Sequence, residues 1–119
     1  MRILKSGSCP SLSGRSTISY HIGHKDDGVY LRLVENSQAG IFSDEWLPLR
    51  EVDDLQAIKS SSIHTLFLRR SFNNGGFMLA VLINEGLVLV TEDARRYSRQ
   101  DPTAFFSAVR ELLETEEAS

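Results

Sequence analysis

Length, composition and charge limit this chain to one domain of ordinary size. It has 119 residues, of which 41% are hydrophobic and 24% are charged, a globular balance that excludes disordered and fibrous proteins. The 13 Lys and Arg against 16 Asp and Glu give a net charge of −3. A histone-like basic surface is therefore excluded, and any nucleic-acid contact has to be a local patch.

Neither a membrane location nor a disulfide framework is expected. No apolar run is long enough to cross a bilayer, and residues 1–7 lack the apolar stretch of a signal peptide, which predicts a cytoplasmic protein. Cys9 is the only cysteine, which excludes an internal disulfide and a cysteine-based zinc cluster. No metal or other cofactor is expected.

The first half reads as a loop followed by a β-hairpin. Residues 6–17 contain five Ser, two Gly and one Pro, a composition typical of a loop. Residues 17–23 and 29–35 are rich in β-branched and aromatic side chains, and the segment 25–28 between them contains the turn dipeptide Asp-Gly. We expect two antiparallel strands joined by that turn.

A helix is expected after a turn at residues 36–40. Ser43 or Asp44 can cap it, and Pro48 is tolerated only in its first turn. Apolar side chains recur at helical spacing at Trp46, Leu49, Val52, Leu55 and Ile58.

The second half begins with an expected strand over residues 63–70 and an expected turn at 73–76. The run 77–83 is continuously apolar, so periodicity does not separate a helix from a strand. Its Met, Leu and Ala favour a helix that ends at Gly86. In the alternative, the run is a strand that turns back into a second strand over 87–91.

The last element is expected to be an amphipathic helix. Asp101 is its N-cap and Pro102 its first residue. An apolar stripe follows at Phe105, Phe106, Val109, Leu112 and Leu113, and the acidic tail 115–119 is expected to fray.

These elements predict a single α+β domain, an antiparallel β-sheet covered on one face by two or three amphipathic helices. The halves 1–60 and 61–119 have a similar order of expected elements, with strands followed by a helix. A degenerate duplication is therefore one hypothesis for the origin of the domain.

Charge is distributed unevenly along the chain. Residues 1–25 and 59–75 carry seven Lys and Arg and no acid, whereas the acids gather on the two expected amphipathic helices. If those helices cover one face of the sheet, the open face is basic and suits an anionic polymer. Alternatively, the acids only decorate solvated helix faces.

Strand alternation places a group of polar and aromatic side chains on that open face. His21, Tyr30 and Arg32 point away from the core, a combination suited to stacking on unpaired bases and neutralising phosphates. An ordinary cross-strand pair is the alternative. The candidate nucleic-acid ligands are Lys5, Arg15, Ser19, His21, Lys25, Tyr30, Arg32, Arg69 and Arg70.

Three enzymatic patterns are considered and set aside, so we expect no enzyme. Residues 7–17 contain glycines, Arg and hydroxyls as a phosphate loop does, but the glycine spacing differs and a strand follows instead of a helix. The two histidines near the hairpin turn, His21 and His24, face opposite sides of a strand, which does not suit a shared metal. Cys9 and His64 lie in no recognisable nucleophile motif.

Part of the chain, residues 29–58, resembles the transcriptional positive cofactor family of single-stranded DNA-binding coactivators, which share a sheet architecture with the plant Whirly proteins. The resemblance is carried by Val29, Leu31, Arg32, Gly40, Ile41, Trp46 and Leu49. The interval from Gly40 to Trp46 is shorter than in the family, and the turn before it lacks the usual lysines. The resemblance implies a curved antiparallel sheet, homodimer formation through the helix, ligand contact by Arg32, and a core or interface position for Trp46 and Leu49.

The leading hypothesis is a non-enzymatic protein that binds single-stranded DNA or RNA in transcription, replication or recombination. The alternative is a protein-interaction module or inhibitor that acts through its acidic helices. A small nucleotide-binding protein that uses the loop 7–17 is the third hypothesis.

Overall fold

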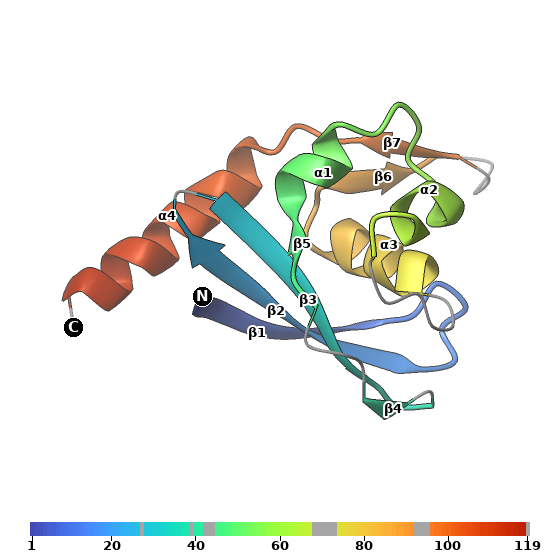
Figure 1. The fold of residues 1–119 in the computed structure, drawn as a ribbon, viewed down its shortest axis with the longest axis horizontal. Coiled ribbons are helices and arrows are strands. Elements are labelled where there is room, and N and C mark those ends of the chain that lie inside the picture. Colours follow the sequence, from blue (N-terminus) through green and yellow to red (C-terminus); the bar gives the residue numbers. More distant parts are fainter. Residues whose placement is uncertain (27, 39, 42–44, 68–73, 92–95, 119) are drawn as a thin grey trace.

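The computed structural model describes residues 1–26, 28–38, 40–41, 45–67, 74–91 and 96–118. Its elements, shown in Figure 1, are β1 (Arg2–Pro10), β2 (Thr17–Lys25), β3 (Gly28–Asn36), β4 (Gly40–Ile41), β5 (Leu47–Pro48), α1 (Leu49–Asp53), α2 (Ser60–His64), α3 (Asn74–Asn84), β6 (Val88–Val90), β7 (Tyr97–Arg99) and α4 (Thr103–Ala118).

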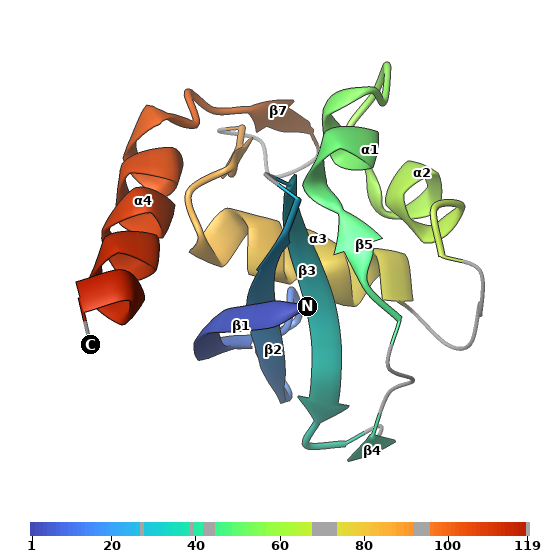
Figure 2. The same cartoon turned by 60° about the vertical axis from the view of Figure 1, so that its left-hand side comes forward.

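The architecture is α+β, as the sequence predicts. In the main sheet β1, β2 and β3 run antiparallel side by side, and the short strands β4 and β5 both pair with β3. Helix α3 crosses one face of this sheet, α4 packs beside β1, and β6 and β7 form a second, two-stranded sheet (Figures 1 and 2). The core lies between the main sheet and the helices. It includes Ile18, Tyr20, Ile22, Leu31 and Leu33 from the strands and Met78, Leu79 and Leu82 from α3.

The predicted hairpin is confirmed. Lys25 pairs with Gly28, so β2 and β3 are joined by a two-residue turn. Asp26 has a φ of 50°, a left-handed conformation that Asp tolerates better than most residues. Gly28 of the expected Asp-Gly dipeptide is thus the first residue of β3, and the left-handed turn residue that the structure describes is Asp26.

The predicted loop over residues 6–17 is wrong, because β1 continues to Pro10 and pairs with β2 along its length. Only residues 11–16 form the connection. Gly7 is needed for packing rather than for a turn, since a Cβ at this position would lie 2.6 Å from the Tyr20 ring. Hydrogen bonds to the neighbouring strand outweigh the loop-like composition.

The predicted helix over 44–58 is also wrong at both ends, because α1 covers only Leu49–Asp53 and Leu55 and Ile58 lie beyond it. Trp46 precedes β5, and α1 begins only at Leu49, with Pro48 as its N-cap at φ −65° and ψ 129°. A residue before proline is biased towards extended backbone, which keeps Leu47 out of a helix. Leu49 and Val52 still face the core, and the expected caps Ser43 and Asp44 lie outside the described residues.

The strand predicted over 63–70 is wrong as well. Residues 60–64 form α2, whose first turn is capped because the Ser62 hydroxyl accepts a hydrogen bond from the Lys59 N–H (3.2 Å). Residues 68–70 lie outside the described part of the chain. The serines at 60–62 are compatible with a turn before a strand, but serine is equally common at the start of a helix. Their presence alone therefore does not show which element follows.

The apolar run 77–83 is helical, which confirms the favoured reading. Helix α3 begins at Asn74, where we expected a turn, and ends just before Gly86, which has a φ of 78°. The Leu87 N–H donates to the Leu82 carbonyl (2.9 Å) and the Gly86 N–H to the Ile83 carbonyl (3.1 Å), the pair of bonds that defines a Schellman cap. The chain then enters β6.

The last helix is confirmed. The Thr103 N–H donates to Asp101 Oδ1 (3.0 Å), and the hydrogen bonds from Thr103 lower the pKa of the Asp101 carboxyl. Phe105 and Val109 are buried, whereas Phe106 is exposed. The helix continues to Ala118 through the tail that we expect to fray. In the described part of the chain, no helix is both long and apolar enough to span a bilayer.

Candidate nucleic-acid interface

The face of the main sheet opposite α3, here called the open face, carries a row of polar and aromatic side chains. Ser6 on β1 pairs with His21 on β2, and His21 pairs with Arg32 on β3, so the three side chains cross the sheet side by side. Ser19 and Tyr30 lie nearby on the same strands and are half-buried. Strand register alone brings these residues together.

Trp46 joins this row from the segment that precedes β5. The Arg32 guanidinium carbon lies 4.4 Å from the centroid of the Trp46 ring, and the His21 ring lies 6.4 Å from it at an interplanar angle of 30°. Arg32 Nη2 is 2.8 Å from His21 Nδ1. His21, Arg32 and Trp46 are called the open-face cluster below.

Gly23 makes room for the tryptophan. A Cβ at position 23 would lie 2.8 Å from two carbon atoms of the Trp46 ring, closer than a real side chain can sit. The ring therefore rests directly on the backbone of β2, where a residue with a side chain would push it away. Trp46 is half-buried in this arrangement.

The charge of the open-face cluster is carried by Arg32. Partial burial and the neighbouring Arg32 charge both lower the pKa of His21, so its imidazole is neutral at physiological pH. A neutral imidazole accepts the guanidinium N–H at Nδ1. The cluster is thus a cation held against two aromatic rings, and this chemistry favours a ligand with both negative charge and flat, polarisable groups.

The other predicted ligands are placed differently. Lys5 faces the helical side, because the β1 register shifts between Ile3 and Lys5 and sets Lys5 opposite buried Ile22. Its Nζ forms an ion pair with the Glu85 carboxylate at 2.9 Å. Arg15 is exposed in the 11–16 connection, and Lys25 is exposed at the end of β2. Arg69 and Arg70 lie outside the described residues.

Trp46 is the open-face residue that the sequence reasoning misses. Helical spacing assigned it to a helix, as a core or interface residue, whereas it lies outside any helix and against Arg32. The available signal was Pro48, which disfavours helix at the residue before it. Leu49 lies in the core, one of the two positions, core or interface, that were expected for it.

A second polar cluster lies on the helical side, where α3 meets β1 and β2. The Tyr20 hydroxyl donates to the Glu85 carboxylate and accepts from Asn84 Nδ2 at 2.9 Å. Only 8% of the Glu85 side chain is exposed, and Tyr20 is fully buried. Burial, followed by the hydrogen bond to Glu85, raises the pKa of Tyr20 well above its usual range. This cluster ties the end of α3 to the sheet.

We expect Tyr20→Phe to reduce the free energy of unfolding by roughly 2 kcal/mol, because it removes a hydrogen bond to a charged, buried carboxylate. The folded-state pKa of Tyr20 is raised above the unfolded value, so its contribution is present below a pH of about 10 and is lost as the pH rises further. Urea unfolding at neutral pH and at a pH of about 11 should therefore show a smaller alkaline loss in Tyr20→Phe than in the wild type.

The matched control is Lys5→Ala, which removes a half-exposed partner of the same carboxylate and leaves Tyr20 in place. It should cost less than about 1 kcal/mol and keep the alkaline loss of the wild type. Equal alkaline losses in Tyr20→Phe and the wild type would contradict the assignment.

The three enzymatic patterns have the following positions in the structure. Gly7 lies within β1, and the connection 11–16 leads directly into β2, so a strand and not a helix follows this segment. Cys9 is buried, and burial raises the pKa of its thiol, which disfavours the nucleophilic thiolate. Among the described residues, no three His, Cys, Asp or Glu side chains are grouped as metal ligands would be.

Comparison with known proteins supplies no relative on which to base a function. No family model, no curated protein and no solved structure matches this chain.

Proposed function

We propose that this protein binds single-stranded nucleic acid on its open face, without catalysing a reaction. The observation that carries the proposal is the open-face cluster, in which the Arg32 guanidinium carbon lies 4.4 Å from the centre of the Trp46 ring. Unpaired bases stack on aromatic and guanidinium planes, and arginine neutralises the adjacent phosphates.

The helices argue against a duplex ligand. Reading the major groove needs an exposed polar helix face, but α3 is apolar and buried over most of its length. The exposed surfaces of α1 and α4 carry acids that repel phosphates, namely Glu51, Asp53, Glu111 and Glu114. Compared with α1, α3 and α4, the open face of the main sheet is therefore the more phosphate-compatible surface.

The family resemblance of residues 29–58 supports the same ligand class. It implies contact through Arg32, which belongs to the open-face cluster. The proposal extends to a homodimer and to a role in transcription, replication or recombination, because these are what the resemblance implies.

Fluorescence anisotropy of a labelled 20-mer tests the proposal. Single-stranded DNA should bind more tightly than the duplex of the same sequence, and the affinity should fall as the salt concentration rises, because bound phosphates release counterions. The variant Arg15→Glu reverses a charge at an exposed position beside the sheet. At low salt it should bind the single strand more weakly than the wild type does.

The control variant is Arg110→Glu, which makes the same charge change at an exposed position on α4. It should leave the affinity for the single strand unchanged within about twofold. If the wild type binds neither DNA form at micromolar concentration, the proposal fails and a protein partner of the acidic helices becomes the better hypothesis.

A further inference from the structure

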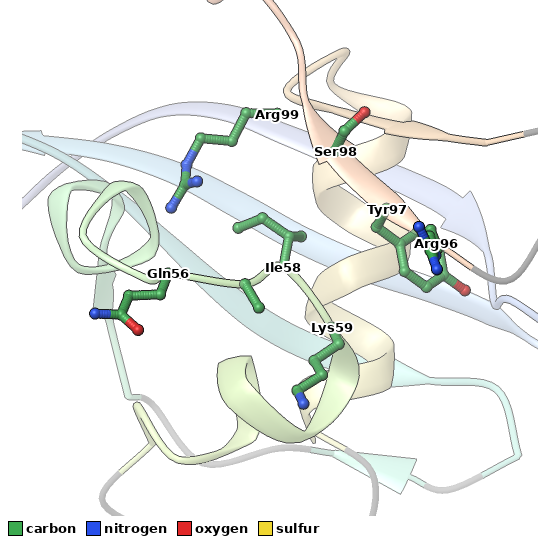
Figure 3. Close-up of a pocket in the computed structure, with 8 residues that line it drawn as sticks. Gln56, Ile58, Lys59, Arg96, Tyr97, Ser98 and Arg99 are labelled. Atoms are coloured by element: carbon green, nitrogen blue, oxygen red, sulfur yellow. The ribbon is translucent and has the colours of Figure 1, made fainter.

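A cleft lies between the segment that joins α1 to α2 and the strand β7, away from the open face. Its volume is about 450 Å³, within the usual range for small-molecule sites. Figure 3 shows Ile58 and Lys59 on the segment that joins α1 to α2, and Arg96 and Tyr97 on the side of the strand β7. Helix α3 separates this region from the main sheet (Figures 1 and 2).

The walls of this cleft carry positive charge. Lys59, Arg96 and Arg99 all line it. The Arg99 guanidinium is already engaged, because it donates to the backbone carbonyls of Asp53 (2.9 Å), Val52 (3.2 Å) and Leu55. Within the described ranges, neither Lys59 nor Arg96 has an ion-pair partner, and both are exposed. Arg99 thus holds the wall in place, and the other two cations are available to an anion.

An apolar cavity of about 270 Å³ adjoins the cationic cleft. The two share Ile58 and Arg99 as lining residues. Its remaining walls are mostly core side chains, including Leu82, Leu87 and Val88, and Asp53 is an acid on its rim. A ligand that spans both would place an apolar group against these core side chains and a linked charge near Lys59 and Arg96.

We propose that the two cavities together form a site for a small organic anion, with the anionic group at Lys59 and Arg96 and an apolar body against Ile58. The positively charged wall suits the anionic group of such a ligand, and the apolar wall suits its body. Tyr97, which also lines the cleft, adds an aromatic surface. A nucleoside monophosphate and a medium-chain carboxylate both have this chemistry. The site is distinct from the open face and goes beyond the nucleic-acid proposal.

The probe is 1-anilinonaphthalene-8-sulfonate, an aromatic anion whose fluorescence rises in an apolar site. We expect saturable binding to the wild-type protein at one site. The double variant Lys59→Ala/Arg96→Ala should weaken it about tenfold or more, because two charge-assisted contacts are lost. Ala57→Trp should also weaken it, since Ala57 is exposed and lines the cleft, so a large side chain fills the space without disturbing the core.

Competition identifies the ligand class. Displacement of the probe by adenosine monophosphate supports the site and assigns it to nucleotides, whereas displacement by decanoate supports it and assigns it to carboxylates. Inorganic phosphate should compete far more weakly than either one, because it has no apolar body. Equal competition by phosphate, or no competition by the two organic anions at millimolar concentration, overturns the proposal.

Matched variants separate this site from other apolar surfaces. Arg110→Ala, an exposed charge removal on α4, should leave probe binding unchanged. Probe binding that persists unchanged in both Lys59→Ala/Arg96→Ala and Ala57→Trp overturns the proposal. Circular dichroism checks that these surface variants fold.

Discussion

Gly75→Ala should destabilise the protein by about 3 kcal/mol and lower its melting temperature by roughly 10 °C or more. A Cβ at this position would lie 2.0 Å from the Ser60 carbonyl oxygen and 2.7 Å from the His64 Cβ. Alanine favours a helix over glycine by about 1 kcal/mol, but this gain is smaller than the cost of separating two packed helices. Urea unfolding followed by circular dichroism measures the difference.

Gly40→Ala is the matched control, because a Cβ at position 40 would meet no other atom within 4 Å, whereas the backbone there has a φ of 94°. The substitution should cost about 1 kcal/mol from backbone strain alone. The contrast between the two glycines separates lack of space from lack of conformational freedom. A Gly75→Ala protein as stable as Gly40→Ala would show that α2 and α3 are not in close contact.

Trp46→Ala should weaken the binding of single-stranded DNA about tenfold or more, since one stacked base on an aromatic ring contributes about 1–3 kcal/mol. The change also releases the Arg32 guanidinium from the ring that positions it. Trp46→Phe, which keeps an aromatic plane, should retain most of the affinity. Anisotropy titration of the labelled 20-mer compares the three proteins.

The intrinsic fluorescence of the protein gives an independent readout, because Trp46 is its only tryptophan. Adding the unlabelled single strand should quench this emission at the concentration at which the labelled strand binds. Phe106→Ala, which removes an exposed aromatic ring from α4, should change neither signal. Binding by Trp46→Ala that equals the wild type would place the ligand elsewhere on the molecule.

Elements with strong local signals are those that the sequence predicts well. The turn segment 25–28 between two strand-like runs predicted the β2–β3 hairpin, and Asp101 followed by proline and an apolar stripe predicted α4. In these segments the backbone preference and the hydrophobic period agree, so distant contacts are not needed to choose the structure. The outward positions of His21 and Arg32 follow from strand alternation in the same way.

Elements whose local signals are neutral or opposed required the tertiary structure. The first strand has loop-like composition and becomes a strand because β2 supplies hydrogen-bond partners along its length. Lys5 faces the helices because of an irregularity in register between Ile3 and Lys5, and a shift of one residue exchanges the two faces of a strand. Composition contains no information about such a shift.

Composition and alternation by themselves determined an α+β domain with a polar, aromatic face on its sheet. Only the tertiary structure decided that Trp46 completes that face and that Lys59 and Arg96 line a cleft together. Both outcomes depend on contacts between segments far apart in sequence. Such contacts are selected by packing and by the loss of apolar surface to water, which act on the whole chain, whereas local patterns report only the preferences of a few neighbouring residues.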